Sequence, residues 1–312
     1  MTSPEAAVPS PSGSRRGPWS RARRLVPDRH LPALCMVGTA LLWGTAPVVT
    51  KLALESLTPF VLSASRWTIS VTVMCLILAR SGSRPVLSPR VAAAGLLGMV
   101  TFTVLFSYGV QRTTAANTTL IGAAMPMLIA LLAAGFLGEA ITRTKAAGIA
   151  LSIVGVAVIV GGASVAGSLT GNLLVSGATV SFAVFTVISR DLVAGHNPLA
   201  VTAGTAIVGL AVFAPAAVVE LRLTEMEPIT WATVATVVYL ALGPSMCSYL
   251  LYGYALSRLP ASQVGVWSNL VPVVGLTAAA IALSEPITLP HLAGGALVLA
   301  GVFVGNRRSS RR

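Results

Sequence analysis

The chain contains an internal duplication of apolar segments. Residues of one half recur in the other at a spacing of 146 positions, and the identical pairs are Tyr108/Tyr254, Arg112/Arg258, Ala115/Ala261, Pro126/Pro272, Glu139/Glu285, Thr142/Thr288, Gly148/Gly294 and Gly155/Gly301. A second spacing of 139 positions relates the earlier segments, and it joins Gly38 to Gly177, Trp43 to Phe182, Lys51 to Arg190 and Pro59 to Pro198. A repeat of this length in apolar sequence indicates a membrane protein with two homologous halves rather than a soluble solenoid.

The composition places these segments in lipid. Apolar residues make up 55% of the chain and charged residues only 10%, whereas about a quarter of the residues of a soluble protein are charged. Most of the apolar stretches approach the ~20 residues that a helix needs to cross a bilayer. The sequence predicts an all-α integral membrane protein with ten transmembrane helices, near 31–50, 60–79, 91–110, 115–138, 146–166, 173–189, 199–219, 231–256, 260–284 and 289–306.

The net charge of +12 follows the predicted topology. Most of the 21 basic residues fall in the two tails and in alternate loops, while the opposite loops hold only Lys51, Arg112 and Arg222. By the positive-inside rule both termini are expected in the cytoplasm, which suits a multi-pass protein of the plasma (inner) membrane. The basic excess is therefore an orientation signal, and no nucleic-acid partner is expected.

Four regions follow from this pattern. Residues 1–30 are expected to form a disordered basic cytoplasmic tail, 31–166 a first five-helix repeat, 172–306 a second five-helix repeat, and 307–312 a short basic cytoplasmic tail. Because each repeat holds an odd number of spans, the second enters the membrane from the opposite side. Inverted halves of this kind can exchange conformations and so produce alternating access.

Two matched prolines are predicted to act as hinges. Pro126 lies 12 residues into its span, roughly 18 Å along it and near the middle of the membrane, and Pro272 occupies the matched place in the second half. Gly148, Gly155 and their mates are expected to let two helices approach closely, either as a scaffold at the back of each half or as a contact in a homodimer.

Residues of both halves resemble the motifs of a known family. Trp43-Gly44, Lys51, Pro59, Arg66, Ala115, Pro126, Gly138-Glu139 and Gly148 resemble the first repeat of the drug/metabolite transporter superfamily, EamA type, and Pro198, Ala261, Pro272, Glu285, Gly294 and Gly301 its second repeat. The resemblance implies ten helices, cytoplasmic termini, a central cavity and the export of small metabolites such as amino acids or nucleosides. The second half departs from the first at Phe182, Thr205 and Ser284.

Polar and aromatic residues in the presumed cavity helices are the candidates for substrate binding, because binding sites combine apolar walls with a few orienting polar groups. They are Trp43, Tyr108, Gln111, Asn117, Phe182, Tyr249, Tyr252, Gln263, Trp267 and Asn269. The alternative for each is a hydrogen bond between helices or core filling. Asn269 and Trp267, beside the Pro272 break, are the first choice.

The charged candidates are Arg66, Glu139 and Glu285. An arginine at the centre of a span costs about 2.5–3.5 kcal/mol on insertion scales, so Arg66 is expected either to anchor the structure, paired with Glu55 or Glu285, or to attract an anion in the cavity. Glu139 and Glu285 lie at span ends and are expected to cap or gate. No aspartate or glutamate lies in the middle of a predicted span.

Enzyme chemistry is not expected. The three cysteines have no paired spacing, and neither a metal motif nor a nucleophile motif is present, so no cofactor and no metal are predicted. A small-molecule exporter is favoured. The alternatives are a lipid-linked or nucleotide-sugar carrier and, further off, a membrane enzyme or sensor.

Overall fold

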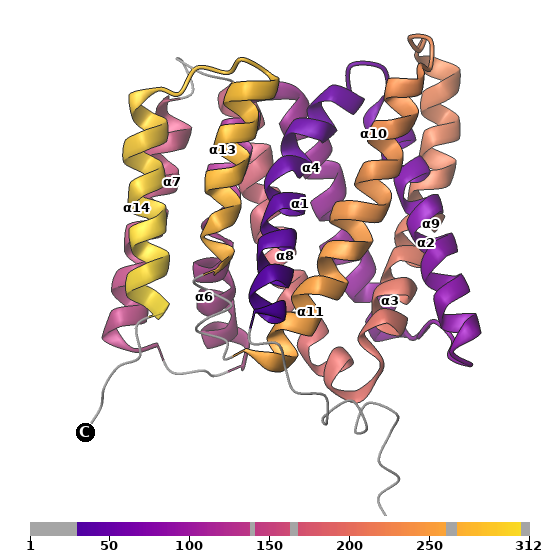
Figure 1. Ribbon diagram of the computed structural model, residues 1–312, viewed down its shortest axis with the longest axis horizontal. Helices are drawn as coiled ribbons and strands as arrows, with labels where there is room; N and C mark the ends of the chain where they lie inside the picture. Colours follow the sequence, from indigo (N-terminus) through magenta and orange to yellow (C-terminus); the bar gives the residue numbers. More distant parts are fainter. Residues whose placement is uncertain (1–29, 138–140, 163–167, 260–266, 307–312) are drawn as a thin grey trace, which may run out of the picture.

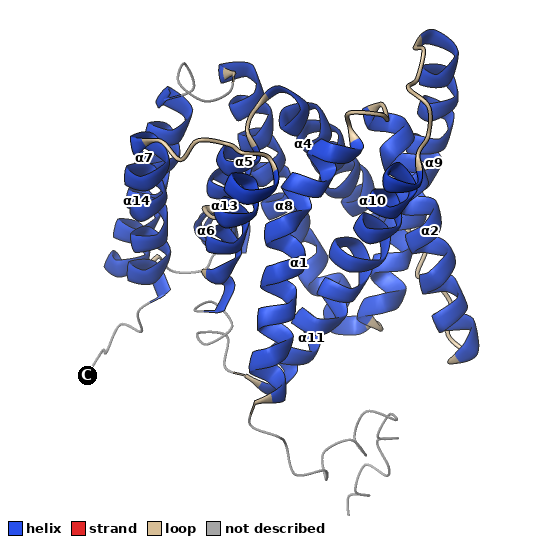
Figure 2. Ribbon diagram, turned by 45° about the horizontal axis from the view of Figure 1, so that its top comes forward, coloured by secondary structure: helices blue, strands red, loops and turns tan. Residues whose placement is uncertain are grey.

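The computed structural model describes residues 30–137, 141–162, 168–259 and 267–306, and this part of the chain is built from helices (Figures 1 and 2). The helices of the first half are α1 (Leu31–Ala53), α2 (Pro59–Arg80), α3 (Pro89–Ala94), the π-helical η2 (Gly95–Val100), α4 (Thr101–Arg112), α5 (Ala115–Gly122), α6 (Met125–Leu137) and α7 (Arg143–Gly161). Those of the second half are α8 (Leu169–Gly195), α9 (Pro198–Leu223), α10 (Trp231–Leu242), the π-helical η4 (Gly243–Cys247), α11 (Ser248–Arg258), α13 (Leu270–Ala282) and α14 (Leu289–Asn306).

The helices have the length and composition of membrane spans. Within the described residues, eight helical stretches are long and apolar enough to cross a bilayer, counting α3 to α4, α5 to α6 and α10 to η4 with the start of α11 as one stretch each. The helices α13 and α14 are apolar but shorter. The prediction of an all-helical membrane protein is therefore confirmed.

Local sequence signals explain where the helices begin. Pro59 and Pro198 stand at the first position of α2 and α9, where the missing N–H of proline costs nothing. Thr142 caps α7 by accepting the N–H of Lys145 at 3.2 Å, and Ser168 caps α8 by accepting that of Gly171 at 3.0 Å. Such caps satisfy N–H groups that have no partner inside the helix.

The helices pack in pairs that correspond between the halves. α1 packs against α11 and α13, and α8 packs against the matched helices α4 and α6. α2 packs against its own mate α9, and α7 against its mate α14 at one side of the bundle (Figure 1). Gly148 contacts the backbone of Gly301, and Gly155 that of Gly294. The glycine faces predicted to be close-packed thus meet each other within one chain.

Helices are interrupted at related places in the two halves. α5 ends at Gly122 and α6 begins at Met125, so Pro126 is the second residue of a new helix. Pro272 is the third residue of α13, which follows a turn at Asn269. The π-helical turns η2 and η4 interrupt the helices that lead into α4 and α11. Whether the prolines act as hinges stays a prediction.

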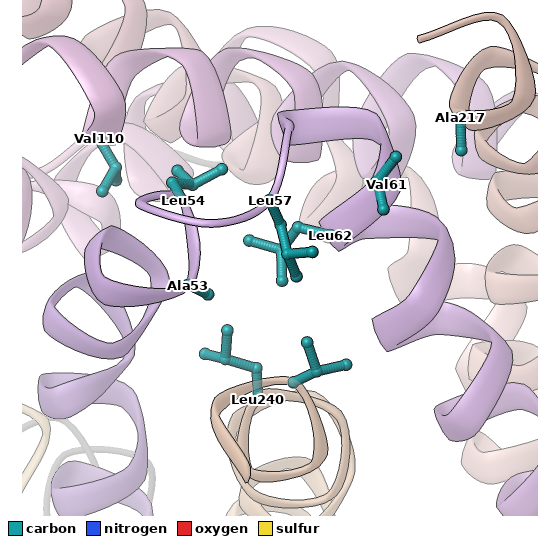
Figure 3. Close-up of a cluster of buried hydrophobic side chains, with 9 residues drawn as sticks. Ala53, Leu54, Leu57, Val61, Leu62, Val110, Ala217 and Leu240 are labelled. Atoms are coloured by element: carbon teal, nitrogen blue, oxygen red, sulfur yellow. The ribbon is translucent and has the colours of Figure 1, made fainter. Parts of the chain in front are cut away.

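We call the end of the bundle where α1 leads into α2 the upper face, and the opposite end the lower face. α1 begins and α14 ends at the lower face (Figure 1). At the upper face the α1–α2 turn inserts Leu57 among apolar side chains of several helices (Figure 3). This cluster consists of Ala53, Leu54, Leu57, Val61, Leu62, Val110, Ala217, Val237 and Leu240. It packs apolar side chains between α1, α2, α4, α9 and α10.

Candidate functional site

A carboxylate at the upper face joins three parts of the chain. Glu285, in the loop between α13 and α14, forms an ion pair with Lys51 of α1, with 2.9 Å between Oε1 and Nζ. The backbone N–H of Ala115 donates to Oε1 at 2.9 Å and that of Ala116 to Oε2 at 3.0 Å. Lys51 Nζ also donates to the carbonyl of Thr113 at 2.9 Å. We call Lys51, Glu285 and the start of α5 the upper clasp.

The electrostatics of the upper clasp are favourable because a helix N-terminus carries a partial positive charge and free N–H donors. The carboxylate thus caps α5 rather than its own helix. The suggested pairing of Arg66 with Glu285 is wrong, since Lys51 holds this carboxylate. The sequence did not predict this contact, because Lys51 and Glu285 lie 234 residues apart.

A second carboxylate, that of Glu220, also accepts hydrogen bonds from the start of a helix. Glu220, near the end of α9, accepts the N–H of Phe60 at 2.9 Å and that of Val61 at 3.2 Å. It also accepts the hydroxyl of Tyr108 at 3.3 Å. The predicted substrate-binding residue Tyr108 is therefore tied to the cap of α2. Glu220 was not among the sequence candidates, and no motif around it would have singled it out.

A buried polar network lies beside the upper clasp. His291, in the first turn of α14, accepts the backbone N–H of Thr288 at Nδ1, so its Nε2–H donates to Asn117 Oδ1 at 2.7 Å. Asn117 Nδ2 in turn donates to Asn172 Oδ1 of α8 at 3.1 Å. Asn117 and His291 are each 2% exposed. Asn117 was predicted to bind substrate, but the structure places it in this contact between α5, α8 and α14.

His291 was not among the sequence candidates. A signal was present, since a threonine followed three residues later by a hydrogen-bonding side chain is the spacing of a helix cap. Thr288 and His291 have this spacing, and both the N–H and the hydroxyl of Thr288 contact His291 Nδ1.

Three predicted substrate-binding residues come together between α1 and α11. The ring of Trp43 lies 5.6 Å from that of Tyr249 and 5.4 Å from that of Tyr252, measured between centroids. Trp43 Nε1 donates to the carbonyl of Pro244 in η4 at 3.3 Å, which fixes the orientation of the indole. We call Trp43, Tyr249 and Tyr252 the aromatic cluster.

Arg66 lies in α2, inside one of the membrane-spanning stretches. The side chain is buried, its Cζ lies 5.2 Å from the ring centroid of Trp67, and its Nε has no hydrogen-bond partner. The ion pair found among the described residues joins Lys51 and Glu285, and no carboxylate in this part of the chain forms an ion pair with Arg66. The expected partner Glu55 is exposed at the upper face.

The other predicted residues lie apart. Phe182 of α8 packs against Phe102, with 5.1 Å between the ring centroids. Gln111 is exposed near the end of α4. Trp267 packs against a small cluster formed by Cys35, Met36 and Ala255, and Asn269 directly precedes α13. Gln263 and Glu139 lie outside the described residues.

Several known proteins with the names of transporters, exporters or efflux pumps are similar to this chain along most of its length. A "Probable terminal-alkyne amino-acid exporter" of Streptantibioticus cattleyicolor is 31% identical over 280 residues, covering 89% of this chain and 94% of the relative. A "Probable amino-acid metabolite efflux pump" of Salmonella typhimurium is 29% identical, covering 85% and 91%. An uncharacterized transporter of Archaeoglobus fulgidus is 28% identical, covering 86% and 96%.

A solved structure and a family model also match the chain along most of its length. A solved structure described only as "Crystal structure of protein" superposes with a TM-score of 0.65 at 22% identity, and covers 90% of this chain and all of its own. The model of the EamA-like transporter family matches twice, over residues 30–161 and 169–307. The protein is therefore a membrane transporter of the EamA-like family, within the drug/metabolite transporter superfamily.

Proposed function

We propose that the protein is a secondary-active exporter of a small metabolite, of the amino-acid or nucleoside kind, that works by alternating access between two inverted five-helix halves. The observation that carries the proposal is the upper clasp, which closes one face of a bundle whose helices are interrupted at related places. Opening the upper face requires Glu285 to release Lys51 and the start of α5. A gate needs a small number of interactions that can form and break, and the upper clasp has an ion pair and a few hydrogen bonds of this kind.

The correspondence of helix pairs supports the inverted arrangement. α1 packs against α11 and α13 of the second half. Its counterpart α8 packs against α4 and α6 of the first half, which are the counterparts of α11 and α13. A motion that changes the contacts of α1 with α11 and α13 therefore has a symmetry-related motion, which changes the contacts of α8 with α4 and α6. The names of two relatives, an amino-acid exporter and an amino-acid metabolite efflux pump, support export and this class of substrate.

Export is tested by metabolite release from cells that produce the protein. We expect faster release of at least one metabolite with the unaltered protein than with Pro272→Leu combined with Asn269→Leu, because this change restores a continuous helix beside the cluster that holds Trp267. Pro215→Leu is the matched control, since Pro215 is an exposed proline inside α9. Equal release from all three strains across amino acids, nucleosides and drugs contradicts the exporter proposal.

The orientation has its own test. We place the upper face outside the cell and both termini in the cytoplasm, in the plasma membrane, because the basic residues gather in the tails and in the loops of one side. A membrane-impermeant thiol reagent should therefore label intact cells at a cysteine introduced at Glu55, and should reach cysteines added at either terminus only after permeabilisation. Labelling of the two termini from different sides of the membrane contradicts the topology.

A further inference from the structure

We propose that the imidazole of His291 is a proton-binding site that controls the upper clasp. With the clasp formed, the hydrogen bonds of the ring exclude a second ring proton, and a proton bound there favours the open upper face. The ligand is a proton from the solution at the upper face. This inference rests on the proposed transport function, in which the upper clasp is a gate, and adds a regulator of that gate.

The hydrogen bonds of His291 define its charge. The backbone N–H of Thr288 donates to Nδ1 at 3.0 Å. A backbone N–H can only donate, so Nδ1 carries no proton. The one proton of the neutral ring is therefore on Nε2, which donates to Asn117 Oδ1 at 2.7 Å. His291 is 2% exposed, so the closed upper face holds a buried, neutral imidazole with both nitrogens occupied.

A second ring proton is incompatible with these contacts. On Nδ1 it would face the N–H of Thr288, and two donors cannot form a hydrogen bond with each other. It would also leave a charge in a buried site, which is costly. Thr288 must therefore move away before the ring can be charged. Glu285 lies three residues before Thr288 in the same loop, so this movement displaces the carboxylate of the upper clasp.

The imidazole and the carboxylate hold the same turn of α5. Glu285 accepts the N–H groups of Ala115 and Ala116, and His291 donates to the side chain of the next residue, Asn117. Loss of the imidazole contact therefore loosens the turn that the carboxylate holds. Because the open form binds the proton and the closed form does not, protonation shifts the equilibrium toward the open form.

Few charged groups face the imidazole from the helices around it. The neighbouring helices α5 and α6 contain no charged side chain. α7 runs antiparallel to α14, since Gly148 meets Gly301 and Gly155 meets Gly294. Its charged residues therefore lie at the lower face, and they are Arg143 and Lys145.

At the upper face, the charge of Glu285 is balanced by Lys51 in the ion pair. Arg112, at the end of α4, is exposed. Among the described residues no carboxylate bonds to the ring of His291. The clasp therefore offers little compensation for a charged imidazole while it stays closed.

The duplication places a different side chain at the lower face. At the spacing of 146 positions, His291 corresponds to Lys145 and Thr288 to Thr142. Thr142 accepts the backbone N–H of Lys145, so the cap of α7 does not use the side chain at that position. A lysine ammonium only donates hydrogen bonds, whereas an imidazole changes charge near neutral pH. The proton is therefore expected to act on the upper gate and not on its lower counterpart.

The test measures access to the upper clasp as a function of pH. The full-length protein, without its native cysteines and with Ala116→Cys, is reconstituted in nanodiscs, so both faces have the same pH. Ala116 is 1% exposed, and a maleimide therefore reaches this thiol only after opening. Its labelling rate is divided by that of Glu55→Cys, an exposed position at the same face, which corrects for ionisation of the thiol.

We expect this ratio to rise at least about tenfold from about pH 8 to about pH 5. An exposed imidazole has a pKa near 6.5, so the open form gains its proton over this range and is favoured as the pH falls, while the closed form is favoured above it. His291→Gln keeps a donor and an acceptor but cannot become charged, and its ratio should stay constant.

His196→Gln is the matched control, because it removes an exposed histidine that directly follows α8. It should keep the full pH response. A ratio that is constant with His291 present overturns the inference. So does a response that survives in His291→Gln, which would assign the effect to Glu285.

Should His291→Gln fail to fold, the native ring decides. With His30→Gln and His196→Gln present, nitrogen NMR of histidine-labelled protein reports the charge of His291 alone. We expect a neutral ring protonated at Nε2 at high pH, and a charged ring that appears together with labelling of Ala116→Cys. A charged ring with a protected thiol overturns the inference. Opening at low pH without metabolite release from producing cells contradicts the transport function and leaves the proton site standing, so the two failures are distinguishable.

Discussion

Gly155→Leu is expected to prevent the protein from accumulating as a folded species in the membrane. A Cβ atom at Gly155 would lie 2.7 Å from the carbonyl oxygen of Gly294 and 2.8 Å from the backbone nitrogen of Val298. Both obstacles are backbone, so no side-chain rotation can relieve the contact. Overpacking of a close-packed interior costs about 1–3 kcal/mol where neighbours can shift, and here α7 and α14 would have to separate.

The separation would spread along the whole helix pair. Gly148 meets the backbone of Gly301 in the same way, with 2.5 Å between a built Cβ and the Gly301 oxygen. Helix association in lipid depends on such close approach, because the bilayer supplies no hydrophobic drive between helices. Fluorescence-detected size exclusion of the membrane extract measures the result, and we expect aggregated or absent protein.

Gly161→Leu is the control for this prediction. Gly161 belongs to the same helix, and a Cβ there meets nothing within 4 Å. The two variants add the same side chain to the same helix, so only the packing differs. A monodisperse Gly155→Leu protein with unchanged thermal stability would show that the glycine contacts between α7 and α14 do not hold the bundle together.

The spans were readable from the sequence because hydropathy and the spacing of proline and glycine are local. The breaks at Pro126 and Pro272 belong to this class, since proline acts on the backbone next to it. The glycine pairs were indicated by the duplication, although their contacts cross from α7 to α14. The π-helical turn η4 was less accessible. Only the structure shows that Pro244 lies in a π-helical turn and that its carbonyl accepts a hydrogen bond from Trp43 Nε1.

The site was predicted less completely, because partners across the bundle leave no trace in the spacing of residues. Trp43, Tyr249 and Tyr252 were named as candidates and do come together. Asn117 was named for the same reason, but its amide is committed to His291 and Asn172. Polarity inside a span marks both kinds of residue equally, and only the neighbours decide between them.

Glu285→Ala is expected to destabilise the protein by an amount near the lower end of about 3–5 kcal/mol, the range for breaking a buried ion pair. The change leaves the Lys51 ammonium without its anion and the N–H groups of Ala115 and Ala116 without their acceptor. The lower end applies because the Lys51 side chain is 30% exposed and can still reach water. The midpoint of thermal unfolding of the purified protein measures the effect.

The same variant should open the upper face more often. In a background without the native cysteines, a cysteine at Thr114 should react faster with an impermeant maleimide in Glu285→Ala than with Glu285 present, because the start of α5 has lost its anchor. Glu55→Ala is the matched control, an exposed carboxylate at the same face, and should leave both readouts unchanged. Lys51→Met combined with Glu285→Ala should cost less than the sum of the single changes, since the two residues share one interaction. Additive losses, or equal labelling rates, would mean that the Lys51–Glu285 pair does not control access from the upper face.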